Sequence, residues 1–363
     1  MPMFSKLLTI IVPAYNMEEY LPKCLSSLLV SDPAQLQRLE VIVVNDGSKD
    51  ETSAIAHRFE RDHPGIFRVV DKPNGNYGSC INAALPEAAG TYVKILDADD
   101  SVSKPGLEAL LFQLQKESGK GDQQADLVVT DYNWVRPDGS VLLHVSHPLP
   151  PGENRSFSDM PPLACFFQMH GLAYRTAIFD RIRYRQTEGI SYTDIEWAIE
   201  PCVAVRRITY LPVNVTLYLV GRSGQTVDHV TMANNYWMVA KVARELAIRF
   251  PERLRESVPE AHDYFQRQTL SFLSLVYQHC IYGIHGHRAN ADLRDLDNCI
   301  RAIPETFRET ESFRVPQARF PVRLIHAWRR HPGIGTPAIV ANGFFLRLKE
   351  FKRSVKTSFK GRA

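Results

Sequence analysis

The sequence predicts an α/β fold in which a mostly parallel sheet is covered by helices and followed by a helical C-terminal region. Short apolar runs rich in β-branched residues alternate with amphipathic segments over the first third of the 363 residues. Strands that are buried on both faces and joined by helices produce this pattern. From about residue 230 onward, apolar residues recur at helical spacing instead.

Each expected element of the first part follows from its own apolar pattern. The strand-like runs cover residues 7–14, 40–45, 67–70, 92–96 and 126–135. The segments with helical spacing cover residues 18–30, 51–63, 77–89 and 104–118. Residues 139–221 are richer in proline, and strand candidates at 206–211 and 214–220 favour an antiparallel addition to the sheet edge.

The last third is expected to be helical. Helical spacing covers residues 231–250, 260–283, 291–303 and 344–360. Five prolines mark expected loops between or after these segments, namely Pro304, Pro316, Pro321, Pro332 and Pro337.

The composition is that of a globular protein, with 44% hydrophobic and 23% charged residues. The 43 basic and 40 acidic side chains leave a net charge of +3, which is too balanced for nucleic-acid binding through bulk electrostatics. None of the six cysteines forms a Cys-x-x-Cys pair, which argues against a zinc ribbon and favours a reducing cytoplasm. No stretch is apolar over the length needed to span a bilayer.

Polar residues follow three of the expected strands. The first strand ends in Pro13–Asn16 (PAYN), the second in Asn45–Ser48 (NDGS) and the fourth in Asp97–Asp100 (DADD). Ligands of open parallel sheets bind beyond the carboxyl ends of the strands, so these residues are candidates for one site. Three carboxylates within four positions indicate a divalent cation that bridges to a diphosphate. A turn that caps the next helix through Ser101 or Ser103 is the alternative.

Other nucleotide signatures are weaker or missing. Gly75 and Gly78 indicate a tight turn into a helix whose N-terminal N–H groups suit an anion, although a plain loop explains them nearly as well. The turn after the first strand lacks Gly-x-Gly-x-x-Gly, which disfavours NAD chemistry. A Walker loop and a Gly-x-Ser-x-Gly elbow are also missing from the sequence.

Three ordered motifs resemble those of the family 2 glycosyltransferases, which have a GT-A fold. They are Thr9–Asn16 (TIIVPAYN), Val43–Thr52 (VVNDGSKDET) and Leu96–Asp100 (LDADD). The later segments HGLAYR, YTDIE and YLVGRSGQ are similar to those of a bacterial polysaccharide-type branch, so the resemblance covers about residues 7–226. It implies a nucleotide-sugar-binding sheet with a C-terminal helical extension.

The resemblance also implies roles for individual residues. Asp99 is expected to ligate Mn²⁺ or Mg²⁺, with Asp97 near the ribose or the metal, and Asp194 is expected to act as the catalytic base. His170 and Glu196 are implied candidates on the acceptor side. The residues implied for nucleotide binding are Pro13, Ala14, Tyr15, Asn16, Asp46, Lys72, Gly75, Gly78, Asp97, Arg222 and Gln225.

The chain departs from the family pattern at two places. Many members carry Ala-Arg-Asn where this chain has Cys80–Asn82, so Lys72 or Lys94 is expected to supply the positive charge. The common Glu-Asp pair at the base is Thr193-Asp194 here. From the sequence alone, an N-cap for the helix expected at 195–205 is an equally good interpretation of Asp194.

The function implied by the resemblance is an inverting glycosyltransferase. It would move a sugar from a nucleotide diphosphate donor, with UDP as the expected nucleotide, to a glycan or lipid-linked acceptor in cell-surface polysaccharide synthesis. Its catalytic domain would span residues 1–226, with a donor half at 1–118 and an acceptor half at 119–226, before a helical region at 227–363. A nucleotidyltransferase and a non-catalytic nucleotide-binding scaffold are the alternatives. The sequence does not specify the sugar, the acceptor or the oligomeric state.

The chain ends in a basic amphipathic pattern over residues 344–363. One helical face is apolar, and Lys and Arg occupy much of the rest; the apolar residues are Phe344, Leu348, Phe351, Val355 and Phe359. Such a helix binds an anionic membrane surface, which would place the protein at the inner face of the membrane. Packing of the apolar face on the protein body is the other interpretation.

Overall fold

The computed structural model describes residues 5–152, 154–160, 167–222, 225, 229–282, 289–314 and 323–330. The chain forms two compact units. The first comprises Met1–Asp228 with Glu256–Phe265, and the second comprises His229–Arg255 with Gln266–Ala363. The division into a catalytic domain and a helical region at 226/227 stays a prediction. The helix expected at 344–360 lies outside the described residues.

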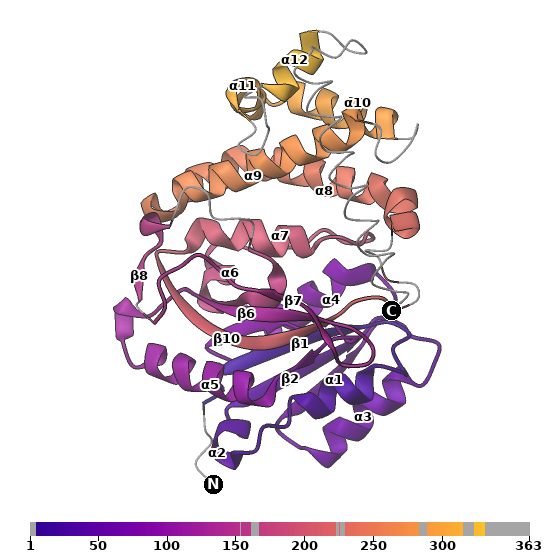
Figure 1. The fold of residues 1–363 in the computed structure, drawn as a ribbon, viewed down its shortest axis with the longest axis vertical. Helices are drawn as coiled ribbons and strands as arrows, with labels where there is room; N and C mark the ends of the chain where they lie inside the picture. The colour runs from indigo at the N-terminus through magenta and orange to yellow at the C-terminus, as the bar shows by residue number, and fades with distance from the viewer. Residues whose placement is uncertain are drawn as a thin grey trace. The chain divides into compact units, whose positions relative to one another are not determined.

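One sheet with the strand order β3-β2-β1-β4-β9-β6-β10-β5 runs through the first unit (Figure 1). Its first four strands are parallel to one another. They span Leu8–Ala14 (β1), Leu39–Asn45 (β2), Phe67–Asp71 (β3) and Tyr92–Ile95 (β4). β1, β2 and β4 are buried almost completely, as a parallel sheet covered on both faces requires. The predicted parallel α/β sheet is therefore confirmed.

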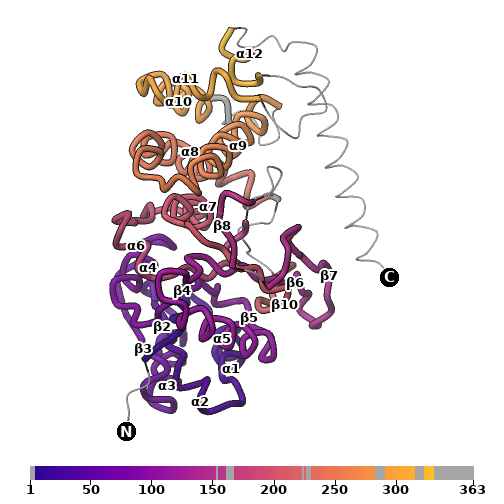
Figure 2. Tube along the Cα trace, turned by 90° about the vertical axis from the view of Figure 1, so that its left-hand side faces the viewer, coloured from indigo at the N-terminus to yellow at the C-terminus, as the bar shows by residue number. Residues whose placement is uncertain are grey.

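The other half of the sheet is mixed in direction. Its strands are Ser101–Val102 (β5), Leu127–Val135 (β6), Val141–Val145 (β7), Arg155–Ser156 (β8), Leu172–Arg175 (β9) and Arg207–Leu219 (β10). β9, which the sequence patterns do not reveal, lies antiparallel between β4 and β6. Figure 2 shows β7 beside β6, on the side of the unit away from β3.

The antiparallel addition to the sheet edge expected at 206–211 and 214–220 is only partly correct. The two segments form the single strand β10, which runs parallel to β6. Pro212 has no N–H to contribute to the ladder, and the pairing with β6 shifts register between Leu211 and Asn214 without ending the strand. Only the short strands β5 and β8 pair with β10 in the antiparallel sense.

Helices cover both faces of this sheet, with α1, α3 and α5 on one face and α4, α6 and α7 on the other (Figure 1). Their bounds are Leu21–Ser27 (α1), Pro33–Leu36 (α2), Thr52–Asp62 (α3), Asn76–Ala84 (α4), Lys104–Ser118 (α5), Ala177–Arg181 (α6) and Asp194–Ile199 (α7). The hydroxyl of Ser103 accepts a hydrogen bond from the Gly106 N–H and caps α5, as one interpretation of this turn predicted.

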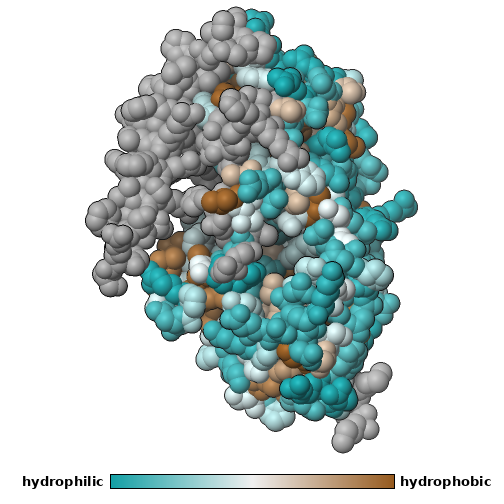
Figure 3. All heavy atoms as spheres, turned by 90° about the vertical axis from the view of Figure 1, so that its right-hand side faces the viewer, coloured by the Kyte–Doolittle hydropathy of each residue, from teal (hydrophilic) through white to brown (hydrophobic). Residues whose placement is uncertain are grey.

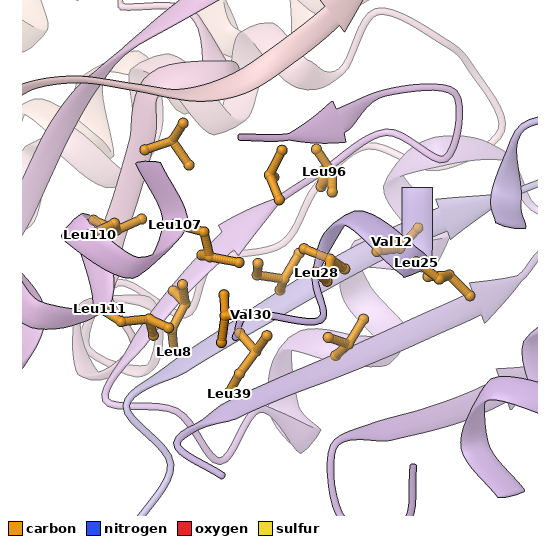
Figure 4. Packing of buried hydrophobic residues seen from close by; sticks show 14 of the residues in the cluster. Leu8, Val12, Leu25, Leu28, Val30, Leu39, Leu96, Leu107, Leu110 and Leu111 are labelled. Carbon is orange, nitrogen blue, oxygen red and sulfur yellow. The ribbon is translucent and has the colours of Figure 1, made fainter. Parts of the chain in front are cut away.

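The core of the first unit lies where helices α1 and α5 pack on β1. Leu25 of α1 and Leu107 and Leu111 of α5 lie over Leu8 and Val12 of β1, and all five side chains are buried (Figure 4). Burial of each such side chain contributes roughly 1.5–3 kcal/mol. This packing fixes the strand whose carboxyl end leads into the candidate site.

The second unit is helical. Its helices are His229–Glu256 (α8), Pro259–Ile281 (α9), Ala289–Arg301 (α10), Pro304–Ser312 (α11) and Leu324–Arg330 (α12), and the first residues of α9 belong to the first unit. The loop expected near Pro304 is the short connection at 302–303, and the proline itself begins α11, where a missing N–H costs nothing. The other four expected loop prolines lie outside the described residues. Among the described helices, none is long and apolar enough to cross a membrane.

Candidate active site

A cavity of about 550 Å³ opens in the first unit at the carboxyl ends of β1, β2 and β4. Figure 3 shows the side toward which these strands point, where the described side chains of the first unit are mostly hydrophilic. Most of the residues singled out in the sequence line this one cavity: Pro13, Ala14, Tyr15, Asn16, Asp46, Asp97, Asp99, His170, Asp194, Arg222 and Gln225. Among the described residues, the remaining candidates Lys72, Gly75, Gly78 and Glu196 lie outside its lining.

The turns after β1 and β2 are tied together by hydrogen bonds. The N–H of Asn16 donates to the Ser48 hydroxyl at 3.0 Å, and the Asn16 side chain accepts from the Lys49 N–H at 2.9 Å. Asn16 has a φ of 53°, a left-handed conformation that asparagine tolerates better than most residues. The neighbouring Tyr15 ring remains 42% exposed and forms part of the cavity wall.

Asp46 caps helix α4. Its carboxylate accepts from the backbone N–H groups of Gly75 at 3.0 Å and Asn76 at 2.9 Å, and from Lys72 Nζ at 2.6 Å. The N-terminal N–H groups of α4 that the sequence suggests for an anionic ligand are therefore directed at a carboxylate of the chain. Lys72 likewise neutralises Asp46 and donates a second hydrogen bond, to Ser79, at 2.8 Å.

Gly78 has a packing role inside α4. A Cβ at this position would lie 2.0 Å from the carbonyl oxygen of Thr187. The missing side chain therefore allows the segment before α7 to approach α4. The expected tight turn is wrong for Gly78, since the residue lies within a helix.

The three carboxylates after β4 have three different environments. Tyr77 donates its hydroxyl to Asp97 at 2.9 Å, and burial beside Asp99 raises the pKa of Asp97 to about 7. Asp99 accepts from Arg222 Nε at 2.5 Å. Asp100 is buried, accepts from the Leu219 N–H at 2.8 Å, and burial raises its pKa well above the usual value.

A second oxygen of Asp100 faces His170. The distance between Asp100 Oδ2 and His170 Nδ1 is 3.7 Å, and neither atom makes a hydrogen bond within the described residues. Together with a carboxylate oxygen of Asp97, these atoms lie within 4.8 Å of one another. Carboxylate oxygens and an imidazole nitrogen are a donor set that fits Mn²⁺. The residues present at this edge therefore fit a divalent cation.

Lys94 places a cation beneath these acids. It is 1% exposed, and its ammonium donates to the backbone carbonyl of His170. Burial lowers the pKa of Lys94 to about 7, although Asp100 and Asp97 oppose that shift. His170 packs on the Tyr218 ring at 4.3 Å between centroids, and burial lowers its pKa to about 3, so the imidazole is neutral.

Asp194 is the first residue of α7 and lines the cavity. The interpretation of Asp194 as an N-cap is wrong, since Thr193 holds that position and makes no side-chain capping bond. Tyr192 has a φ of 66°, which turns the chain sharply just before the helix. Burial raises the pKa of Asp194 to about 6, which is suitable for a base near neutral pH.

The chain is similar to known proteins in sequence. Residues 9–182 match the family described as glycosyl transferase family 2. These residues belong to that family. Over 136 residues, the chain is 35% identical to a hyaluronan synthase of Pasteurella multocida, covering 38% of this chain and 13% of that protein. It is 31% identical over 143 residues to the glycosyltransferase GlyG of Streptococcus pneumoniae serotype 4, covering 39% and 44%.

The fold has relatives among solved structures. The S. aureus protein TarS matches with a TM-score of 0.52 and 19% identity, covering 86% of this chain and 56% of TarS. A shorter TarS structure, residues 1–349, matches with a TM-score of 0.50 and 18% identity, covering 85% and 93%. At this identity the likeness shows the fold alone, and it confirms the predicted GT-A type. The sequence matches span less than half of the hyaluronan synthase and GlyG.

Beyond the residues that match the family, Glu196 braces the chain before α7. Its buried carboxylate accepts from the Thr187 N–H at 2.7 Å and the Thr187 hydroxyl at 2.6 Å. Gln186 adds a bond from its side-chain amide to the Thr193 carbonyl at 2.7 Å. These contacts hold the turn that positions Asp194, and the acceptor role expected for Glu196 stays a prediction.

The cavity lining also includes residues that the sequence reasoning missed. They are Met17, Asn74, Asn76, Tyr77, Cys80, Ala98, Met169, Ser191, Tyr192 and Tyr218. Tyr77 is the most informative, because it lies on α4 and its hydroxyl donates a hydrogen bond to Asp97 at the end of β4. No spacing in the sequence indicates that a tyrosine of α4 reaches the end of β4. That contact depends on how α4 packs across the sheet.

Proposed function

We propose that the first unit is an inverting glycosyltransferase that moves a sugar from a nucleoside diphosphate donor, with UDP as the nucleotide, to a glycan or lipid-linked acceptor. The observation that carries the proposal is that Asp97, Asp99, Asp194 and Arg222, from three separate parts of the sequence, line one cavity. Carboxylates for a metal, a cation for a diphosphate and a base are the groups that this transfer requires.

Asp99 and Asp97 would hold Mn²⁺ or Mg²⁺, and the ligand atoms of Asp100 and His170 lie within 4.8 Å of one from Asp97. When bound, the ion would neutralise negative charge on the diphosphate leaving group. Arg222 would move its guanidinium from Asp99 to the diphosphate, since both are oxygen anions that suit its forked donors. Gln225, which donates to the Leu219 carbonyl at 2.5 Å, would hold the segment that carries Arg222.

A single displacement at the anomeric carbon needs a base on the acceptor side. Asp194 would accept the proton of the acceptor hydroxyl, and its raised pKa makes the carboxylate basic enough for that step. Tyr15 and the residues Pro13–Asn16 would line the nucleotide pocket. Asp46 would contact the nucleobase through the carboxylate oxygen that accepts a hydrogen bond from the Asn76 N–H at the start of α4. His170 and Tyr218 would form the sugar side of the cavity.

The acceptor class is the least constrained part of the proposal. The relatives include proteins named hyaluronan synthase and chondroitin synthase, and these names support a glycan as the product. A lipid-linked acceptor would suit membrane contact through residues 344–363, which lie outside the described residues and stay a prediction. The location at the inner face of the membrane depends on the same residues and is therefore also a proposal.

The test is the thermal midpoint of the wild type and of Asp99→Asn with UDP, GDP, CDP and dTDP, each with and without Mn²⁺. A ligand at 100 times its Kd stabilises the native state by about 2.7 kcal/mol. We expect a midpoint shift for UDP that needs Mn²⁺ and is lost in Asp99→Asn. Release of UDP from a panel of UDP-sugars would then identify the donor.

The matched control is Asp62→Asn, which removes the same charge from an exposed residue at the end of α3. It should shift with UDP and Mn²⁺ as the wild type does. A shift for GDP alone would correct the nucleotide but keep the transferase. A UDP shift without release of UDP from any sugar donor would favour the non-catalytic scaffold instead.

A further inference from the structure

A second cavity of about 510 Å³ lies at the opposite edge of the sheet in the first unit. Arg175, which lines it, pairs in register with Tyr92 at the start of β4. Asp97 of the candidate active site follows the end of the same strand. Five residues of extended chain at about 3.3 Å each separate the two ends by roughly 16 Å. The two cavities are therefore distinct sites.

Four arginines line this second cavity, which we call the arginine cavity: Arg175, Arg181, Arg206 and Arg207. The side chains of Arg181 and Arg206 are exposed and have no ion-pair or hydrogen-bond partner among the described residues. Arg175 lies 3.7 Å from Asp126, which is a loose contact. Arg207 donates to the Asn154 side chain at 2.5 Å, so a neutral group holds its guanidinium.

Three acidic residues, Asp122, Asp126 and Glu260, share the wall with the four arginines, and Asp126 forms an ion pair with Arg175. Asp126 accepts from the backbone N–H groups of Arg206 at 2.9 Å and Arg207 at 3.2 Å, so it fixes the turn that presents both residues. Glu260 lines the cavity, and its Oε2 is buried without a hydrogen-bond partner among the described residues. A buried carboxylate oxygen without a donor is costly, and a ligand hydroxyl would satisfy it.

We propose that the arginine cavity binds a phosphate-bearing compound that also carries a hydroxyl, such as a phosphorylated polyol or sugar. Guanidinium groups bind phosphate oxygens through two parallel hydrogen bonds, and several of them around one hollow select an anion with several oxygens. The hydroxyl of the same ligand donates to Glu260. This site does not depend on the proposed transferase activity.

The test uses glycerol 3-phosphate and inorganic phosphate as probes, with the full chain and EDTA, measured by titration calorimetry. The variant Arg181→Gln/Arg206→Gln changes two exposed side chains, so its melting temperature should stay at the wild-type value. We expect the Kd for both probes to rise at least about tenfold, because charge-assisted hydrogen bonds are lost. The variant Glu260→Gln should weaken glycerol 3-phosphate while leaving inorganic phosphate bound.

The matched control is Arg58→Gln/Arg61→Gln, which removes two exposed arginines from α3. Equal weakening in this control, or no binding by the wild type, would overturn the proposal.

Sedimentation with phosphatidylglycerol vesicles identifies the source of the phosphate. Vesicle binding that the Arg181→Gln/Arg206→Gln variant loses indicates a lipid headgroup, whereas binding of the free probe only indicates a soluble compound. The UDP and Mn²⁺ midpoint shift should be unchanged in the same variant, which separates this site from the donor site.

Discussion

The guanidinium Nε of Arg222 lies 2.5 Å from Oδ2 of Asp99, so the chain itself supplies a cation to the carboxylate expected to ligate the metal. The two side chains are 16% and 10% exposed, and the Arg222 guanidinium also lies 5.5 Å from the centre of the Tyr20 ring. An arginine cannot give up its charge by losing a proton. Metal binding at Asp99 must therefore compete with Arg222, unless Arg222 moves to the diphosphate.

This competition predicts that Arg222→Gln binds Mn²⁺ more tightly than the wild type when no nucleotide is present. A charge-assisted hydrogen bond is worth roughly 1.5–3 kcal/mol, so the Mn²⁺ Kd should fall by about tenfold. Free Mn²⁺ measured by electron paramagnetic resonance gives this Kd. With UDP present, the gain should reverse, because the diphosphate loses its guanidinium. Arg136→Gln, on the exposed turn after β6, is the control and should bind Mn²⁺ as the wild type does.

Asp194 predicts an acidic limit to turnover. Its pKa is raised to about 6, so the carboxylate is charged above that pH and protonated below it. A base acts only in the charged form, and turnover should therefore fall as the pH decreases through about 6. The pH profile of kcat/KM with a UDP-sugar donor measures this limb.

The Asp194→Asn variant should lower turnover by about 10²–10⁴-fold while the UDP and Mn²⁺ midpoint shift persists. Its residual turnover should show no limb near pH 6. If turnover of Asp194→Asn still falls near pH 6, that fall belongs to another group. Near-normal turnover in this variant would show that Asp194 is not the base.

The close packing at Gly78 predicts that one substitution lowers both the stability of the fold and the turnover at the candidate active site. Alanine at position 78 would place its Cβ 2.0 Å from the Thr187 carbonyl, and such overpacking costs typically about 1–3 kcal/mol. That cost should outweigh the gain in helix propensity of about 1 kcal/mol. Urea unfolding of Gly78→Ala should show the loss, and turnover should fall because the segment leading to Asp194 moves. Gly119→Ala, whose Cβ would lie no closer than 3.6 Å to a neighbour, should be near neutral.

The hydrogen bonds of Asp297 predict that Asp297→Asn destabilises the second unit. Its carboxylate accepts from Tyr277 at 2.6 Å and from the Nε atoms of Arg301 and Arg329, each at 2.6 Å. Arg329 is 4% exposed, and Asp297→Asn would leave its charge without this carboxylate. Arg329 keeps its ion pair with Glu311 at 2.7 Å, so the loss should be smaller than the about 3–5 kcal/mol of a buried charge left unpaired. Calorimetric unfolding should show the loss.

The control for Asp297 is an exposed ion pair in the same unit. Arg255 and Glu305 lie 3.1 Å apart and are 66% and 53% exposed. Glu305→Gln should change stability by no more than about 1 kcal/mol, since surface pairs contribute little. Equal losses in the two variants would show that Asp297 adds nothing beyond a surface charge.

The strand patterns of the first half were sufficient to predict β1, β2, β3 and β4. Each is a short, β-branched run in which the local apolar pattern agrees with burial in the sheet. Polar residues at the ends of β1, β2 and β4 had to meet at one edge, because parallel strands end on the same side. Asp46, Asp97 and Asp99 could therefore be named from the sequence alone.

The tertiary structure decided what those residues contact. β9 pairs antiparallel with β4 and β6 from a distant part of the sequence, and its four residues carry no pattern that fixes this register. That pairing brings His170 to Asp100, while the packing of α4 brings Tyr77 to Asp97. Glu196 has the sequence position of a site residue but turns its carboxylate to Thr187. A sequence determines which groups follow each strand, whereas the direction of a side chain depends on packing between elements far apart along the chain.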